Sequence, residues 1–371
     1  MDRIQRKELL EKTLQFQNHG RILVDVLISL PQYRRMLDHL NVQTETELLD
    51  ALGSDFFYVP GRDISQNEGY LPYYKNALYM DEKTRVCPLG IRWQRKSYDS
   101  KFSVDEALDG PFQRDDVTVE DILKHPWPTA KDFDFSGMVG ACEEAGERLT
   151  IGGLWTGIMG DSYRMMGFQN FLCNAAMDPE LVQTLIDRMT EMYLSLNDAI
   201  FAQLKGKLDI WFFGNDFGAQ NGLLLSPTMI EDYFYHNIKA LCALAHQYDV
   251  RVMMHSCGGI VPIIPMLAEA GVEILDPIQV TAKGMDPDSI ADSCGGKIVF
   301  HGGIDTQQVL PTGTPEQVAA HAQRVTDALG ATGGYIFAPS QILDQDVPCE
   351  NIMAMYDAIR NINQKYEEER T

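Results

Sequence analysis

Residues 250–259 read VRVMMHSCGG, an apolar run rich in valine and methionine that ends in a histidine, a cysteine and two glycines. A short apolar run bounded by turn residues predicts a buried β-strand. A similar order of apolar run and polar, glycine-containing loop occurs at residues 210–220 and 297–307. The three segments together predict strands whose following loops contain polar side chains.

Extending this pattern in both directions gives eight candidate strands. They begin near Ile22, Phe56, Leu149, Ile210, Val250, Val272, Lys297 and Tyr335. From the third candidate onward, the gaps between strands contain apolar residues at helical spacing. One such set is Ile230, Phe234, Ile238 and Leu241. Eight strands that alternate with helices predict an α/β fold, a (β/α)8 barrel formed by residues 1–371 as a single domain.

Two helix starts support this prediction. Ser226-Pro227 and Thr314-Pro315 each place a capping hydroxyl before a proline at the first helical position. Residues 61–148 interrupt the alternation with aromatic residues, prolines and alternating runs. We interpret this segment as an inserted hairpin with helices that covers the barrel mouth, and a small separate domain is the alternative.

The composition narrows the classes of partner. The chain has 371 residues, of which 45% are hydrophobic, and this is enough for a sizeable core. Its formal net charge of −22 would repel phosphate backbones and anionic lipids, so nucleic acid and membranes are not expected as partners. Residues 1–18 mix charged residues with leucine and do not resemble a signal peptide, which favours a cytoplasmic protein.

The cysteines point to metal binding more than to disulfides. Seven cysteines form an odd, scattered set, so reduced thiols are expected. Only Cys257 lies beside another metal-ligating residue, His255, and residues two apart on an extended chain point the same way. Zinc prefers such nitrogen and sulfur ligands. The alternative is a buried thiol next to a hydrogen-bonded histidine.

Other polar residues follow the predicted strands at the same end of the barrel, where active sites of this fold lie. Asp216 and Gln220 follow the fourth strand, Asp305 the seventh and Gln341 the eighth. We predict that these four residues belong to the catalytic site. Polar or glycine turns that only connect strand and helix are the alternative at each position.

Taken together, five segments resemble the uroporphyrinogen decarboxylase superfamily. They are residues 216–220, His255-Ser256-Cys257-Gly258, residues 301–305, the sequence LPTGTPE at 310–316, and Ala338-Pro339. The resemblance is clearest between residues 149 and 362. This superfamily contains two chemistries, so the fold alone does not define the reaction.

One branch decarboxylates the acetate arms of uroporphyrinogen and has a Met-Arg-Gln-Ala-Gly-Arg segment after its first strand. The corresponding residues 29–36 read SLPQYRRM here and lack that pattern, although Arg34 and Arg35 are present. Uroporphyrinogen decarboxylase, a lyase of porphyrin biosynthesis, is therefore the second hypothesis. A non-catalytic barrel that binds a small molecule is the third.

The other branch contains methyltransferases that work with a corrinoid (cobalamin) protein and bind zinc through a His-x-Cys pair and a later cysteine. His255 and Cys257 match the pair, but Ser340 and Gln341 occupy the place of the later cysteine. Asp216 could complete the zinc site, a substrate could do so, or the metal could be lost and His255 could act as an acid or base. We favour Asp216.

The resemblance thus implies, as the leading hypothesis, a zinc-assisted transfer of a methyl group between a small molecule and a corrinoid carried by a partner protein. Zinc would act as a Lewis acid, and Asp216, Gln220 and Asp305 would orient the substrate. The identity of the methyl donor or acceptor does not follow from these side chains.

Overall fold

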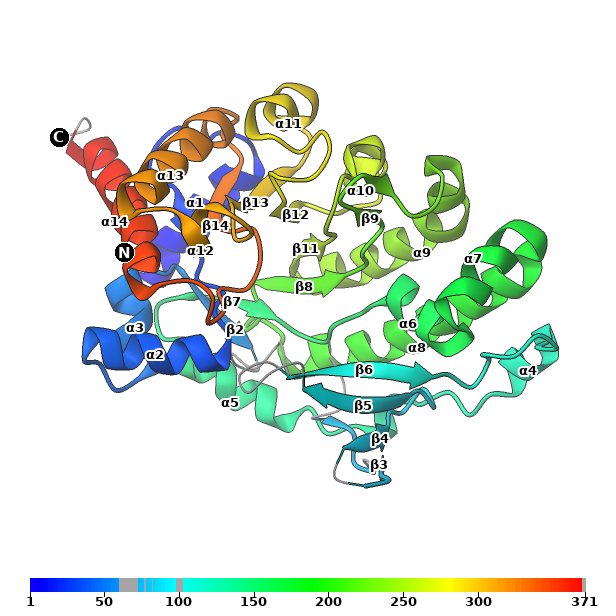
Figure 1. Cartoon of the computed structure of the whole chain (residues 1–371). Helices are drawn as coiled ribbons and strands as arrows, with labels where there is room; N and C mark the ends of the chain where they lie inside the picture. Colours follow the sequence, from blue (N-terminus) through cyan, green and yellow to red (C-terminus); the bar gives the residue numbers. More distant parts are fainter. Residues whose placement is uncertain (60–72, 77, 82, 98–102, 369–371) are drawn as a thin grey trace.

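The computed structural model describes residues 1–59, 73–76, 78–81, 83–97 and 103–368. Its centre is a sheet of eight strands in the spatial order β1-β14-β13-β12-β11-β8-β7-β2. The strands are β1 (Leu23–Val24), β2 (Phe56–Val59), β7 (Leu149–Gly152), β8 (Ile210–Gly214), β11 (Arg251–His255), β12 (Ile274–Ile278), β13 (Val299–Ile304) and β14 (Tyr335–Pro339). Every neighbouring pair is parallel, and Figure 1 shows helices around the strands. The predicted (β/α)8 fold is confirmed.

The first and last strands of this order nearly close the barrel. The backbone N–H of Asp55 donates to the carbonyl of Val24 across the seam, at 2.8 Å. Each strand begins within two residues of its predicted start; the largest offsets are at β12, which begins at Ile274, and β13, which begins at Val299. The apolar runs therefore define the strands with little help from distant contacts.

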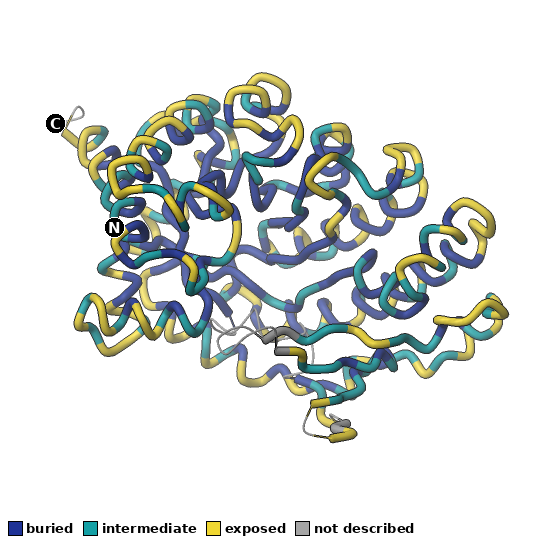
Figure 2. The backbone as a smooth tube through the Cα atoms, in the orientation of Figure 1, coloured by how far each residue is buried: buried dark blue, intermediate teal, exposed yellow. Residues whose placement is uncertain are grey.

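Helices form the outer layer. Those that follow β7 are α6 (Ile158–Met166), α7 (Phe168–Met177), α8 (Pro179–Gln203), α9 (Pro227–Gln247), α10 (Ile264–Glu269), α11 (Pro287–Cys294), α12 (Val309–Thr312), α13 (Pro315–Gly330) and α14 (Cys349–Glu368). Both predicted helix starts are confirmed, because Ser226 caps α9 and Thr314 caps α13 in a capping box with Gln317. Figure 2 shows that the helices expose their outer faces and bury their inner ones.

The hydrophobic core has two parts, as alternating side chains on a closed sheet require. The larger part lies between strands and helices. The smaller part fills the barrel interior and includes Phe56, Tyr58, Phe212, Met253 and Val299. Leu10 of α1 (Arg3–Leu14) joins the interior cluster, so this helix covers the amino end of the barrel and leaves the carboxyl end for function.

Two further helices, α2 (Leu30–Leu40) and α3 (Glu45–Leu52), lie between β1 and β2. Between β2 and β7 the chain forms an antiparallel sheet of β3 (Leu78–Tyr79), β4 (Thr84–Val86), β5 (Arg92–Ser97) and β6 (Ser103–Asp109). The short helices α4 (Val119–Lys124), η3 (Ala130–Asp132) and α5 (Ser136–Glu144) follow.

This inserted segment is joined to the barrel helices. The N–H of Phe112 donates to the carbonyl of Met165 in α6, at 2.9 Å. Residues 61–72, 77, 82 and 98–102 of the predicted insertion lie outside the described residues, and the boundaries at 61 and 148 stay a prediction. Among the helices of the described ranges, none combines the length and the apolar character needed to cross a bilayer.

Gly152, at the end of β7, allows β2 and β7 to approach closely. Its φ is +144°, and a Cβ atom there would lie 1.9 Å from the carbonyl oxygen of Val59. We expect Gly152→Ala to lower the free energy of unfolding by roughly 1–3 kcal/mol, because the backbone must shift. Urea denaturation measures this change.

Gly137→Ala is the matched control, since Gly137 lies in α5 and a Cβ there meets nothing within 4 Å. Alanine in a helix should raise stability by about 0.5–1 kcal/mol. Equal effects of the two substitutions would contradict the packing described for Gly152.

Candidate metal centre

The loops after β8 and β11 lie against each other at the carboxyl end of the barrel. Gly218 and Gly258 make this approach possible: a Cβ on Gly258, whose φ is +90°, would lie 2.6 Å from the backbone nitrogen of Ala219. The N–H of Gly259 also donates to the carbonyl of Ala219, at 3.0 Å. The glycines after Cys257 therefore bring the loop that contains Asp216 beside the His-x-Cys pair.

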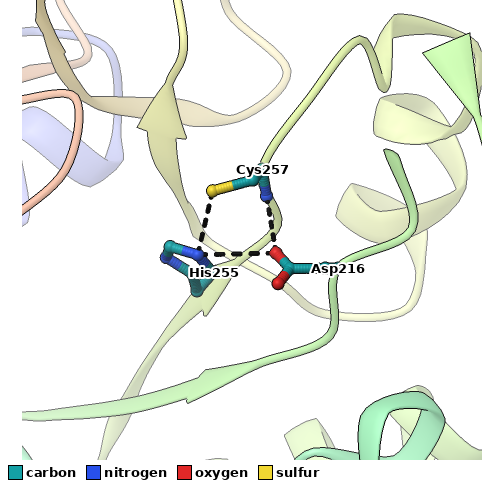
Figure 3. Close-up of side chains that lie close together, drawn as sticks. All are labelled: Asp216, His255 and Cys257. Atoms are coloured by element: carbon teal, nitrogen blue, oxygen red, sulfur yellow. Dashed lines mark hydrogen bonds and ion pairs between the residues drawn. The ribbon is translucent and has the colours of Figure 1, made fainter. Parts of the chain in front are cut away.

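Three potential metal ligands converge there, as Figure 3 shows: Asp216, His255 and Cys257. Nε2 of His255 lies 3.2 Å from Sγ of Cys257 and 3.5 Å from Oδ1 of Asp216. The ligand atoms of the three residues all lie within 4.8 Å of one another. The bond lengths of tetrahedral zinc put nitrogen and sulfur ligands about 3.6 Å apart and nitrogen and oxygen ligands about 3.4 Å apart, so the donor set fits zinc.

The cluster is held from two sides. The backbone N–H of Cys257 donates to Oδ1 of Asp216 at 2.9 Å, which fixes a carboxylate that is otherwise 52% exposed. The other nitrogen of the imidazole, Nδ1 of His255, lies 2.6 Å from Oδ2 of Asp276 in β12. This second contact leaves Nε2 facing the thiol and Asp216. One side of the cluster is thus open to solvent and the other is buried.

Asp276 continues into a buried chain of polar groups inside the barrel. Its Oδ1 lies 2.7 Å from Nδ1 of His301 in β13, and Nε2 of His301 lies 3.0 Å from Oδ2 of Asp25. The hydroxyl of Tyr58 in β2 donates to the same oxygen of Asp25, at 2.6 Å. Asp25, Asp276 and His301 are each at most 2% exposed.

The pKa values follow from this pairing. Burial would lower the pKa of His301, but hydrogen bonds with Asp25 and Asp276 raise it to about 9. Burial would raise the pKa of Asp276, and hydrogen bonds from His255 and His301 lower it to about 2. Burial alone would lower the pKa of His255. Its hydrogen bonds with Asp276 and Cys257 nevertheless raise this pKa well above the ordinary value.

A pH dependence of stability follows from His301. Its folded-state pKa of about 9 exceeds the ordinary 6.5, so its contribution to stability is complete below pH 6.5 and is lost as the pH rises through 9. In metal-free protein we expect the free energy of unfolding to decrease across this window, and to decrease less in His301→Gln protein. Denaturation at several pH values, with a chelator present, measures both slopes. Equal slopes would contradict the assignment.

Of the other predicted site residues, Gln341 contacts the cluster directly and Gln220 is linked to it through another side chain. Nε2 of Gln341 lies 3.7 Å from Sγ of Cys257 and donates to it. The hydroxyl of Ser340 donates to the carbonyl of Ile278 instead, so Gln341 is the side chain that occupies the place of the later cysteine. Gln220 is connected indirectly: its Oε1 accepts from Gln279, whose own Oε1 accepts from the N–H of Gly258.

Asp305 lies in a different environment. Its carboxylate accepts hydrogen bonds from the backbone N–H groups of Gln307, Gln308 and Val309, and its own N–H donates to Nε2 of His321. These described contacts fix the loop that leads into α12. They do not connect Asp305 to the three clustered ligands, and its catalytic role stays a prediction.

Aromatic rings form the wall of the barrel beside His255. The ring centroid of Trp155 lies 5.5 Å from that of His255 and 5.5 Å from that of Phe212. Phe212 in turn contacts Tyr58, with centroids 6.3 Å apart. Trp155 is partly exposed, so it presents an apolar surface to anything bound at the cluster.

Several groups of the site were not predicted from the sequence: Asp25, Tyr58, Asp276 and Gln279. Asp25 directly follows β1 and Gln279 directly follows β12, whereas Asp276 lies in the middle of β12. A search for polar residues just after every predicted strand, including the first and sixth, would have found Asp25 and Gln279 but not Asp276. Tyr58 reads as an ordinary apolar strand residue.

Fold and cluster together define the class of protein: a (β/α)8 barrel with a candidate metal site at the carboxyl ends of its strands. The profile of the family described as Uroporphyrinogen decarboxylase (URO-D) matches residues 115–362, which is more than half of the chain. The chain belongs to this family, and the resemblance inferred from the five segments is confirmed.

The chain is similar in sequence to two named proteins and in fold to a solved structure. Two proteins named uroporphyrinogen decarboxylase, from two strains of Coxiella burnetii, are each 22% identical over 54% of this chain. The chain spans about half the length of these curated relatives. A methyltransferase from Methanosarcina mazei superposes with a TM-score of 0.68 at 14% identity, covering 96% of this chain and 98% of that one. At such identity the superposition shows a common fold.

Proposed function

We propose that this protein is a methyltransferase that moves a methyl group between a small molecule and a corrinoid held by a separate protein, with zinc bound at its active site. The observation that supports the proposal most strongly is the convergence of Nε2 of His255, Sγ of Cys257 and Oδ1 of Asp216 within 4.8 Å at the barrel mouth. The name and fold of the Methanosarcina mazei methyltransferase agree with it.

In this proposal His255, Cys257 and Asp216 hold the metal. Three protein ligands leave a fourth position for substrate, which is typical of a catalytic zinc site. When bound, zinc supplies Lewis acidity to a heteroatom of the methyl donor or acceptor. Asp216 contributes a carboxylate where the family pattern has a second thiolate, so the site would contain one sulfur ligand.

Neighbouring side chains border the place of the substrate or hold the proposed ligands. The partly exposed ring of Trp155 lies beside His255 and provides an apolar surface for a methyl-bearing group. Gln341 donates to Sγ of Cys257, which orients the sulfur toward Nε2 of His255. Gln220 steadies the backbone after Cys257 through Gln279, and this is a positioning role.

Decarboxylation of uroporphyrinogen is the second candidate because the curated relatives carry that name. Arg34 and Arg35, the arginines in the segment that lacks the decarboxylase pattern, are exposed residues of α2. The guanidinium of Arg35 donates to the carbonyl of Gln345 and to the side chain of Gln32. The three groups that converge at the mouth are a carboxylate, a thiol and an imidazole, and these do not attract a substrate with many carboxylates.

One set of assays separates the two candidates. Zinc-loaded protein is mixed with methylcobalamin and a panel of thiols, and with reduced cobalamin and a panel of methylated amines and ethers. We expect zinc-dependent changes in the cobalamin absorption spectrum, absent in His255→Ala protein. Coproporphyrinogen formation from uroporphyrinogen by metal-free protein, with no change in any cobalamin spectrum, would overturn the proposal.

A further inference from the structure

The proposed reaction assigns no role to the buried chain of polar groups behind His255. It connects β11, β12 and β13 with the residues after β1 and with β2, and so crosses the barrel interior. Its central members are Asp276, His301 and Asp25, whose exposed fractions are 2%, 1% and 0%. Burial of so many polar groups costs stability unless all of them are paired. Because this cost is accepted inside an otherwise apolar barrel, we expect these groups to have a function beyond stability.

The hydrogen bonds define where the protons lie on the two histidines. Each oxygen of the Asp276 carboxylate faces one Nδ1 atom, that of His255 at 2.6 Å and that of His301 at 2.7 Å. A carboxylate only accepts hydrogen bonds, so both Nδ1 atoms are donors. His255 therefore has Nε2 as the atom that can bind a metal, and Nε2 is the atom that faces Cys257.

His301 is a donor at both nitrogens. Its Nε2 faces Oδ2 of Asp25 at 3.0 Å, and Tyr58 and the N–H of Val26 also donate to Asp25. An imidazole with two N–H donors is a cation, so His301 lies as a positive charge between two carboxylates. The two carboxylates and the one cation leave a single net negative charge behind the neutral metal-binding form of His255.

We propose that His301, fixed by Asp25 and Tyr58, is a positioning residue of the metal centre that holds the Asp276 carboxylate so that His255 presents Nε2 to the metal. This inference rests on the proposed metal centre. Partners of a metal-bound histidine orient its ring and increase its affinity for the metal. Here the supporting group extends one residue further, because Asp276 itself is held on its second oxygen by His301.

The test measures Co²⁺ binding by metal-free protein, since Co²⁺ reports its ligand geometry through its visible absorption bands. Wild-type protein is compared with His301→Gln and with Asp25→Asn, each of which keeps a polar side chain of similar size. His321→Gln is the matched control, because His321 is a half-buried histidine whose Nε2 accepts from the backbone of Asp305, outside the chain.

We expect His301→Gln to weaken Co²⁺ binding about 10- to 100-fold and to change the visible bands, as loss of outer partners does in other metal sites. Asp25→Asn should change both in the same direction by a smaller factor, and His321→Gln should change neither. If His301→Gln does not fold, Asp25→Asn gives the answer. A variant that folds, binds Co²⁺ as tightly as wild type and gives the same bands overturns the positioning role.

The outcomes also separate this inference from the metal centre. If wild-type protein binds Co²⁺ and loses it on His255→Ala while both network variants behave as wild type, only the role of His301 is wrong. If wild-type protein binds neither Co²⁺ nor Zn²⁺, the metal centre and the role of His301 are both overturned.

Discussion

Cys257→Ala protein is expected to contain almost no zinc, whereas wild-type protein should contain close to one zinc ion per chain. The thiolate is the only sulfur among the three clustered ligands, and without it His255 and Asp216 would form a two-ligand site. A structural or catalytic zinc site needs at least three protein ligands, so the apparent affinity should decrease by roughly a thousandfold or more. Elemental analysis after dialysis against a weak chelator measures the loss.

Cys173→Ala is the control, because Cys173 is an exposed cysteine of α7 outside the cluster. Its zinc content should equal that of wild type. Circular dichroism should show the same fold for both variants. Full zinc content in Cys257→Ala protein would mean that the thiol is not a ligand, and the metal centre would have to be placed elsewhere.

Asp55→Ala is expected to give the largest loss of stability, about 3 kcal/mol or more, since removing one partner of a buried ion pair leaves the other charges uncompensated. Asp55 is fully buried at the amino end of the barrel, where Arg6 lies 3.0 Å and Arg21 2.9 Å from its oxygens. It also accepts from the N–H of Val24, at 3.0 Å. The side chain therefore connects α1 and β1 to the start of β2.

Asp288→Ala is the comparison for this substitution. Asp288 and Arg324 form an ion pair at 3.2 Å in which both side chains are about two-thirds exposed. Such pairs contribute roughly 0–1 kcal/mol. Urea denaturation of the two variants should separate them clearly, and a loss of less than 1 kcal/mol in Asp55→Ala protein would show that the buried pair does not support the barrel.

The barrel could be predicted from the sequence because its strands are local apolar runs. Ile210 to Phe213 and Val250 to Met254 are apolar or β-branched almost throughout, as expected for strands buried on both faces. Helix starts are also local, since a hydroxyl before proline is sufficient to place the first turn of α9 and α13. These signals need no information about distant residues.

The inserted sheet was harder to predict. Pairing of β5 with β6 depends on cross-strand contacts such as that between Arg95 and Asp105, at 3.1 Å, and not on an apolar run. The segment was interpreted as a hairpin with helices, and the described part contains four antiparallel strands followed by short helices. Alternation of polar and apolar residues indicated strands there without giving their number.

The candidate site could be predicted in part for the same reason. His255 is the last residue of β11 and Cys257 lies two residues further on, so a continued extended backbone predicts that the two side chains point the same way. Asp216 was proposed as a third ligand because it follows a neighbouring strand and because the later cysteine of the family pattern is absent. Asp276 and His301 depend on which strand residues face the barrel interior and on the register between β12 and β13, and no local pattern gives either.

Zinc K-edge X-ray absorption of zinc-loaded protein tests the central claim, that Cys257, His255 and Asp216 bind one metal ion. We predict a single sulfur neighbour at about 2.3 Å and nitrogen or oxygen neighbours at about 2.0–2.2 Å, with the sulfur absent in Cys257→Ser protein. A first shell without sulfur in wild-type protein, or one unchanged by Cys257→Ser, would contradict it.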